Sequence, residues 1–130
     1  MDGVLQRPDG MELATPDVDV ITDAVLRLFG HHVILRCGAP SGDRRLNAWR
    51  MSQVLVGELR YGSEMSCIVD QPRRDLTFTV PDGCAGQMGR HAYLPGDVLA
   101  FEPDWVGRLE LRAPGHFLNA CFHPDQARLT

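Results

Sequence analysis

The feature that most constrains the fold is a two-residue alternation of apolar and polar residues, which runs in short stretches from residue 33 to residue 122. Such alternation places the apolar side chains on one face of a β-strand. Turns rich in glycine and proline separate the stretches at intervals of about six to twelve residues, which is typical of sandwiches and barrels. The pattern predicts ten short strands, over residues 33–37, 46–51, 54–61, 65–69, 76–80, 84–88, 91–94, 98–101, 108–111 and 117–122.

The connections between these strands are too short, and too rich in turn formers, to contain a second helical period. Parallel strands need crossover connections, usually helices, so we expect an antiparallel sheet built of hairpins. Closing such a sheet into a barrel or jelly roll removes its exposed edges and leaves an interior wide enough for one small ligand. We therefore predict a mainly β domain whose function lies in its interior.

One amphipathic helix is predicted over residues 16–29, ahead of the first of these strands. Thr15 can cap its N-terminus, Pro16 suits the first helical position, and Gly30 can end it in a left-handed conformation. Its apolar residues form one stripe that must pack against the rest of the domain. The stripe consists of Val18, Ile21, Val25, Leu28 and Phe29.

The two ends of the sequence differ from the region between them. Residues 1–14 contain turn formers and no sustained periodicity, so we expect a flexible N-terminal arm before a single domain over residues 15–130. Residues 123–130 resemble the first turn and a half of a helix, with Pro124 near its start. The sequence stops within this expected helix, and we expect the chain to be one domain of a longer protein.

Charge and hydropathy exclude two classes of partner. The net charge is −4, whereas nucleic-acid-binding domains carry an excess of positive charge on one face. The pairs Arg44–Arg45 and Arg73–Arg74 are short charge runs of the kind found at solvated loop corners. No apolar run is long enough to span a membrane, and the N-terminus lacks the regions of a signal peptide, so we expect a cytoplasmic protein with no membrane partner.

The four cysteines are widely spaced and lack the pairing of zinc fingers. We expect reduced thiols that pack as small hydrophobic side chains. They are Cys37, Cys67, Cys84 and Cys121.

Several short motifs occur in a characteristic order. They are LFGHH at residues 28–32, GELRYG at 57–62, YLPGD at 93–97, FEP at 101–103 and FHP at 122–124. In this order and at these distances, the region from about residue 16 to residue 130 resembles the N-terminal cupin-like regulatory domain of AraC-type transcriptional regulators. The resemblance implies a cupin-like β-barrel, or jelly roll, that binds an effector or mediates dimerisation. It also implies a C-terminal region, outside this chain, with two helix-turn-helix units. DNA would be a partner only through that region.

A metal centre of the kind found in metal-dependent cupins is not expected, because that ligand set is missing. Those cupins present a His-x-His pair with a nearby Glu and a further His beyond the Pro-Gly turn, whereas this region offers His91 alone. His31 and His32 are adjacent, so their side chains point apart in an extended chain and are not expected to share a metal ion. We expect them to be residues of the segment that leaves the helix. There is no Gly-x-Ser-x-Gly nucleophile motif. We therefore expect no metal, no cofactor and no catalysis.

A ligand pocket is the favoured kind of site, since such pockets are mostly apolar with a few placed polar groups. Alternation predicts that Leu55, Gly57, Leu59 and Tyr61 face the interior. By the same rule, Leu76, Phe78 and Val80 are expected to face inward, Thr77 and Thr79 outward, and Leu109 and Leu111 inward. The side chains that could stack on an effector or hydrogen-bond to it, or else fill the barrel, are Trp49, Tyr61, Met65, Phe78, Met88, His91, Tyr93 and Trp105.

The sequence thus favours a non-enzymatic regulatory domain that senses a small-molecule effector, forms a homodimer, or does both. Two alternatives stay open. One is a small cupin enzyme, such as an isomerase or a metal-dependent dioxygenase, which would carry a bound metal. The other is a structural dimerisation module that responds to no ligand.

Overall fold

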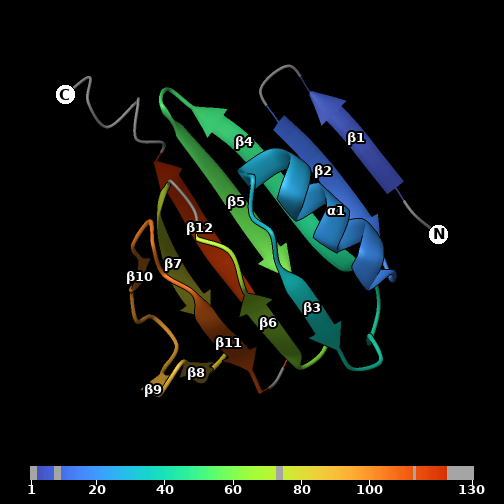
Figure 1. The fold of residues 1–130 in the computed structure, drawn as a ribbon. Helices are drawn as coiled ribbons and strands as arrows, with labels where there is room; N and C mark the ends of the chain where they lie inside the picture. Colours follow the sequence, from blue (N-terminus) through green and yellow to red (C-terminus); the bar gives the residue numbers. More distant parts are fainter. Residues whose placement is uncertain (1–2, 8–9, 73–74, 113, 123–130) are drawn as a thin grey trace.

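The computed structural model describes residues 3–7, 10–72, 75–112 and 114–122, and the fold below refers to these residues. They form two antiparallel sheets and one helix, so the mainly β class is confirmed (Figure 1). The expected C-terminal helix at residues 123–130 lies outside the described residues. No helix within the described residues has the length and apolar character needed to cross a membrane.

The larger sheet has seven strands in the order β1-β2-β4-β5-β12-β7-β10. These are β1 (Gly3–Arg7), β2 (Gly10–Thr15), β4 (Arg44–Met51), β5 (Val54–Arg60), β7 (Leu76–Asp82), β10 (Leu99–Phe101) and β12 (His116–Phe122). The smaller sheet has five strands in the order β3-β6-β11-β8-β9. These are β3 (Ile34–Cys37), β6 (Met65–Val69), β8 (Gly86–Met88), β9 (His91–Tyr93) and β11 (Gly107–Leu111).

All ten strands that the alternation predicts are present, with ends displaced by no more than two residues. Closure into a barrel is not observed, because the strands form two separate sheets. The YLPGD corner is a tight turn between β9 and β10. The Leu94 amide donates to a carboxylate oxygen of Asp97 at 2.8 Å, and Gly96 has a φ of 87°, a conformation that glycine adopts without strain.

The N-terminal segment differs from the flexible arm that the sequence predicts over residues 1–14. β1 and β2 pair antiparallel, from Gly3 opposite Ala14 to Arg7 opposite Gly10, and β2 also pairs along its full length with β4. The alternation within β2 is short, since Leu13 is buried in the core and Met11 packs partly against it, and backbone pairing of β2 with β4 holds the hairpin in addition.

Helix α1 (Val18–Phe29) begins two residues later than predicted and ends where predicted. Asp17, rather than Thr15, is the N-cap, and its carboxylate accepts from the Asp19 amide at 2.9 Å. The Thr15 hydroxyl instead accepts from the Asp17 amide at 3.1 Å, which fixes the approach to the helix. Gly30 is left-handed with a φ of 69°, and its amide donates to the carbonyl of Leu26 at 2.9 Å, as expected of a C-cap.

The helix lies across β2 and β4 of the larger sheet with β3 beside it (Figure 1). Its predicted apolar stripe is inside, because Ile21, Val25 and Phe29 are buried. The inner faces of both sheets and this stripe form one hydrophobic core. The core is the interior that the alternation predicts.

Strand β5 has the faces that the sequence predicts. Leu55 and Leu59 are buried, while Glu58 and Arg60 point outward and form an ion pair at 3.0 Å. Gly57 lies between the buried leucines because the ring of Phe29 occupies the space above it. A Cβ atom at residue 57 would stand 2.5 Å from Cζ of Phe29.

Arg44 contradicts the expectation of a solvated loop corner, because only 3% of it is exposed. Its guanidinium donates to the carbonyl of Pro16 at 3.1 Å, to the carbonyl of Gly38 at 2.9 Å, to the hydroxyl of Ser63 at 2.9 Å and to the carbonyl of Tyr61. Burying a charge is tolerated only where such hydrogen bonds replace water. Arg44 thus ties the start of β4 to the segment between β2 and α1, to the segment after β5 and to the segment after β3.

Candidate functional site

The interior contains a cavity of about 70 Å³ where the end of α1 and the two sheets meet. Most of its lining is apolar. The apolar and aromatic side chains come from α1, the segment after it, and strands of both sheets; they are Val25, Phe29, Val33, Leu35, Leu59, Tyr61, Cys67, Val69, Phe101, Leu109 and Cys121. A cavity needs about 10–15 Å³ of such space to hold one water molecule, so this cavity as it stands holds a ligand of only a few non-hydrogen atoms.

Strand β7 brings the polar part of the lining, and its orientation reverses the prediction. Thr77 and Thr79 are each 3% exposed and face the cavity, whereas Leu76, Phe78 and Val80 lie half-buried on the other face. Threonine can face inward where its hydroxyl finds a partner. Thr79 donates to the side-chain oxygen of Asn119 on β12 at 2.6 Å.

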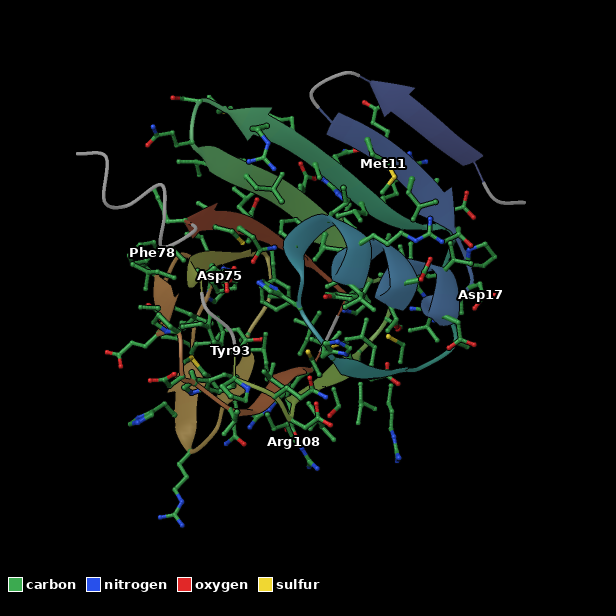
Figure 2. The ribbon with its side chains drawn as sticks, turned by 45° about the horizontal axis from the view of Figure 1, so that its top comes forward. Met11, Asp17, Asp75, Phe78, Tyr93 and Arg108 are labelled. Atoms are coloured by element: carbon green, nitrogen blue, oxygen red, sulfur yellow. The ribbon has the colours of Figure 1, made fainter. Side chains whose placement is uncertain are left out.

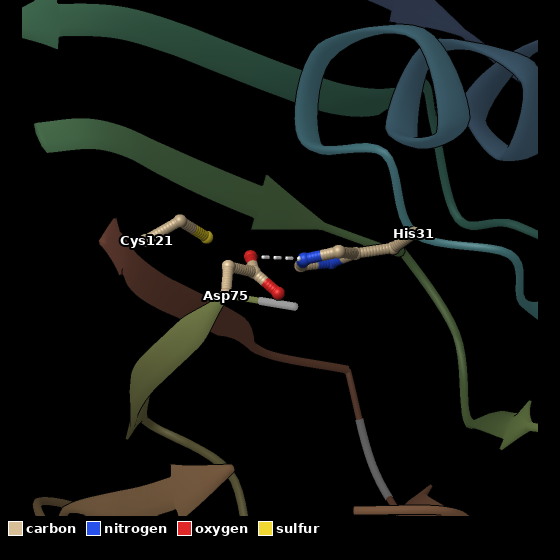
Figure 3. A group of neighbouring side chains, drawn as sticks. All are labelled: His31, Asp75 and Cys121. Carbon is tan, nitrogen blue, oxygen red and sulfur yellow. Dashed lines mark hydrogen bonds and ion pairs between the residues drawn. The ribbon is translucent and has the colours of Figure 1, made fainter. Parts of the chain in front are cut away.

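Figure 3 shows a compact group of three side chains beside this cavity, from segments far apart in the sequence. His31 follows the C-cap of α1, Asp75 precedes β7 and Cys121 lies on β12. Nε2 of His31 is 2.7 Å from Oδ2 of Asp75. All three residues are buried, with exposed fractions of 8%, 3% and 1%, and one ligand atom of each lies within 4.8 Å of the other two.

Thr77 connects this group to the rest of β7. Its hydroxyl lies 3.3 Å from Oδ2 of Asp75, to which it donates, and 3.4 Å from Sγ of Cys121. The ring of His31 also packs on Phe29, with ring centroids 5.7 Å apart. The group therefore links the end of the helix to β7 and β12 of the larger sheet.

Tyr61 is the member of the predicted set that lines the cavity. Its side chain is 5% exposed and packs edge-on against Phe117 with ring centroids 6.1 Å apart. Burial raises the pKa of Tyr61 well above its usual value, with smaller contributions from Cys67 and Cys37. The phenol therefore stays protonated at neutral pH and keeps its ability to donate a hydrogen bond.

The other predicted ligand-binding residues lie elsewhere. Met65 and Tyr93 are buried in the core, and the Tyr93 hydroxyl donates to the carbonyl of Glu110 at 2.6 Å. Met88 and Trp105 are partly buried against the core, the latter with its ring edge-on to Phe101 at 4.8 Å. These four contribute to the core without lining the cavity.

Three predicted residues face away from the interior. Trp49 shares the outer face of β4, since Leu46 and Ala48 take the inner one. Phe78, on β7, lies at the periphery of the molecule (Figure 2) and packs edge-on against Phe122, with centroids 6.0 Å apart. His91 is exposed because it starts an edge strand of three residues, opposite Met88 at the turn, beyond the reach of the core.

All four cysteines are free thiols, as predicted. Burial raises the pKa of Cys37 and of Cys84 above the usual value for a thiol, so both stay protonated at neutral pH. The sequence placed Cys121 in an apolar strand but gave no sign of its polar neighbours. The sequence predicts His31 as a helix-exit residue, and the carboxylate that pairs with it, Asp75, lies 44 residues further along the chain.

Comparison with protein-family models, with curated proteins and with solved structures found no match to this chain. The resemblance to AraC-type regulatory domains therefore stays a prediction from the sequence motifs.

Proposed function

We propose that this chain is a sensor domain that binds a small, mostly apolar effector in the cavity between its sheets. The observation that carries the proposal is the cavity itself, which is apolar over most of its lining and has a polar side formed by His31, Thr77, Thr79 and Asn119. Ligand sites in proteins combine these two features.

The sequence motifs support a more specific form of the proposal. In this form the two sheets are the two halves of a cupin-like jelly roll, and the chain is the cytoplasmic regulatory domain of an AraC-type regulator. Effector binding would shift an existing equilibrium between conformations, or between monomer and dimer, and so act on a DNA-binding region outside this chain.

The position of His31 suggests how an effector would be sensed. His31 lines the cavity, follows α1 directly and is hydrogen-bonded to Asp75 at the start of the larger sheet's β7. An effector that changes this contact changes how the end of the helix is held. Because the cavity is small, an effector larger than a few atoms must displace part of its lining, to which the end of α1 and the segment after it contribute Phe29, His31 and Val33.

The test is a thermal-shift screen of small aromatic and aliphatic compounds, repeated on two phenylalanine variants of neighbouring residues on β6. Val69 lines the cavity, whereas Ile68 points to the outer face of its sheet. A ligand present at a hundred times its Kd stabilises the fold by about 2.7 kcal/mol. We expect stabilisation of the wild type and of Ile68→Phe, and none of Val69→Phe. A ligand that stabilises both variants equally binds outside the cavity and contradicts the proposal.

A further inference from the structure

The group formed by His31, Asp75 and Cys121 offers three different kinds of metal ligand: an imidazole nitrogen, a carboxylate oxygen and a sulfur. Nitrogen and sulfur donors, with a carboxylate as the third ligand, suit zinc and similar divalent ions. The three residues come from three separate segments and meet in the interior, so the fold itself assembles the set. From this arrangement we infer that they form a binding site for a divalent transition-metal ion of the zinc class.

Charge supports this inference. A thiolate and a carboxylate carry two negative charges, which a divalent ion neutralises while the imidazole stays neutral. A buried site with no net charge avoids most of the cost of burying ions. Binding involves no oxidation or reduction: the Cys121 thiol and Nε2 of His31 each present a lone pair, and any proton they carry leaves to solvent. The imidazole then keeps its proton on Nδ1.

The distances are compatible with coordination after small side-chain movements. Ligand atoms that bind one tetrahedral zinc ion at about 2.0–2.3 Å lie about 3.3–3.6 Å from one another. The hydrogen bond between His31 and Asp75 would lengthen from 2.7 Å by about 0.6 Å, and the sulfur of Cys121 would approach from within 4.8 Å. Thr77 stays within hydrogen-bonding reach of Asp75 and can orient it, as outer partners of metal ligands do.

Three protein ligands leave one position of a tetrahedral ion open. His31 and Cys121 both line the cavity of about 70 Å³, so the open position faces that space, which is large enough for a water molecule or a small anion. The site thus goes beyond the proposed sensor function, because an apolar effector can bind in this cavity with no metal present.

The experiment is a titration of the purified chain with Co²⁺ alone, followed by visible and near-ultraviolet absorption. We expect one equivalent to bind with the intense bands of tetrahedral cobalt and a sulfur-to-cobalt charge-transfer band. Cys121→Ser should lose the charge-transfer band, and its Kd should rise by more than about tenfold. Cys67→Ser is the matched control, because Cys67 is buried in the same cavity lining but lies outside the group.

A second variant, His31→Asn, distinguishes the loss of a metal ligand from the misfolding that Cys121→Ser could cause. It leaves all four thiols in place and should also weaken Co²⁺ binding by more than about tenfold, while circular dichroism reports on the fold. A wild-type spectrum that stays that of hydrated Co²⁺ overturns the inference. So does a charge-transfer band that survives Cys121→Ser and disappears in Cys67→Ser.

Discussion

Replacing Gly57 by alanine tests how the cavity wall is built. The new Cβ would stand 2.5 Å from Cζ of Phe29, and 3.3 Å and 3.5 Å from the two adjacent ring atoms. Ordinary contact begins near 3.4 Å, so the tip of the ring must retreat by about 1 Å. Overpacking of this kind costs about 1–3 kcal/mol. Because the ring borders the cavity, it has space to move into, and we place the cost near 2 kcal/mol.

Part of that cost is offset by the lower entropy of the unfolded alanine chain, which contributes about 0.4–1 kcal/mol of stability. The net result is a loss of about 1 kcal/mol, measured as the free energy of unfolding in urea. Gly3→Ala is the control, since a Cβ atom at Gly3 meets nothing within 4 Å. It should be neutral or slightly stabilising.

A double-mutant cycle isolates the contact itself. Leucine at position 29 lacks the ring tip, so Gly57→Ala should cost at least about 0.5 kcal/mol less in a Phe29→Leu background than in the wild type. Additive effects of the two substitutions, or a Gly57→Ala variant as stable as Gly3→Ala, would refute the packing described for this wall.

Three further predictions concern the polar interior. Arg44→Leu should lower the free energy of unfolding in urea by about 3–5 kcal/mol, because it leaves several buried acceptors without a donor. The control Arg45→Leu, at the exposed neighbouring residue, should change it by no more than about 0.5 kcal/mol. Equal losses in the two variants would contradict the role given to Arg44. Burial raises the pKa of both Tyr61 and Tyr93 above the usual value of about 10, so tyrosinate absorbance should stay absent until alkaline unfolding. Because the unfolded chain ionises these phenols more easily than the folded one, the stability that their burial contributes is complete below about pH 10 and is lost as the pH rises above it. A phenol that ionises near pH 10 in the folded protein would disprove the burial of that tyrosine. Thr79→Val keeps the shape of the side chain but removes its hydrogen bond to β12, and should cost about 1–2 kcal/mol in the same urea assay; a neutral effect would show that the hydroxyl is not held there.

The sequence predicts those parts of the fold that local chemistry determines. Alternation with turn residues locates ten strands, and Gly30 marks the end of α1 because glycine adopts the left-handed conformation without strain. The faces of β5 follow in the same way, since Leu55 and Leu59 lie on its inner face and the charged Glu58 and Arg60 on its outer face. Each of these depends on residues close together in the chain.

The predictions that fail depend on partners distant in sequence. The β1–β2 hairpin depends on pairing with β4, and Arg44 is buried because carbonyls from three loops receive its hydrogen bonds. On β7, alternation shows that the threonines and the apolar residues lie on opposite faces but not which face is inside. That choice depends on acceptors from β12 and on Asp75.

The candidate site could be predicted only in part for the same reason. Tyr61 was found because it continues the inner face of β5. The group of His31, Asp75 and Cys121 has no common spacing, and only the packing of α1 against two sheets brings its members together.

The central claim is that the space between the sheets is preformed and open to small ligands, and xenon tests it most directly. Xenon binds in mostly apolar cavities that water leaves empty. Diffraction from xenon-pressurised crystals should show one xenon site bordered by Phe29, Leu59 and Tyr61. Crystals in which these side chains fill the space, with no xenon between the two sheets, would contradict the account.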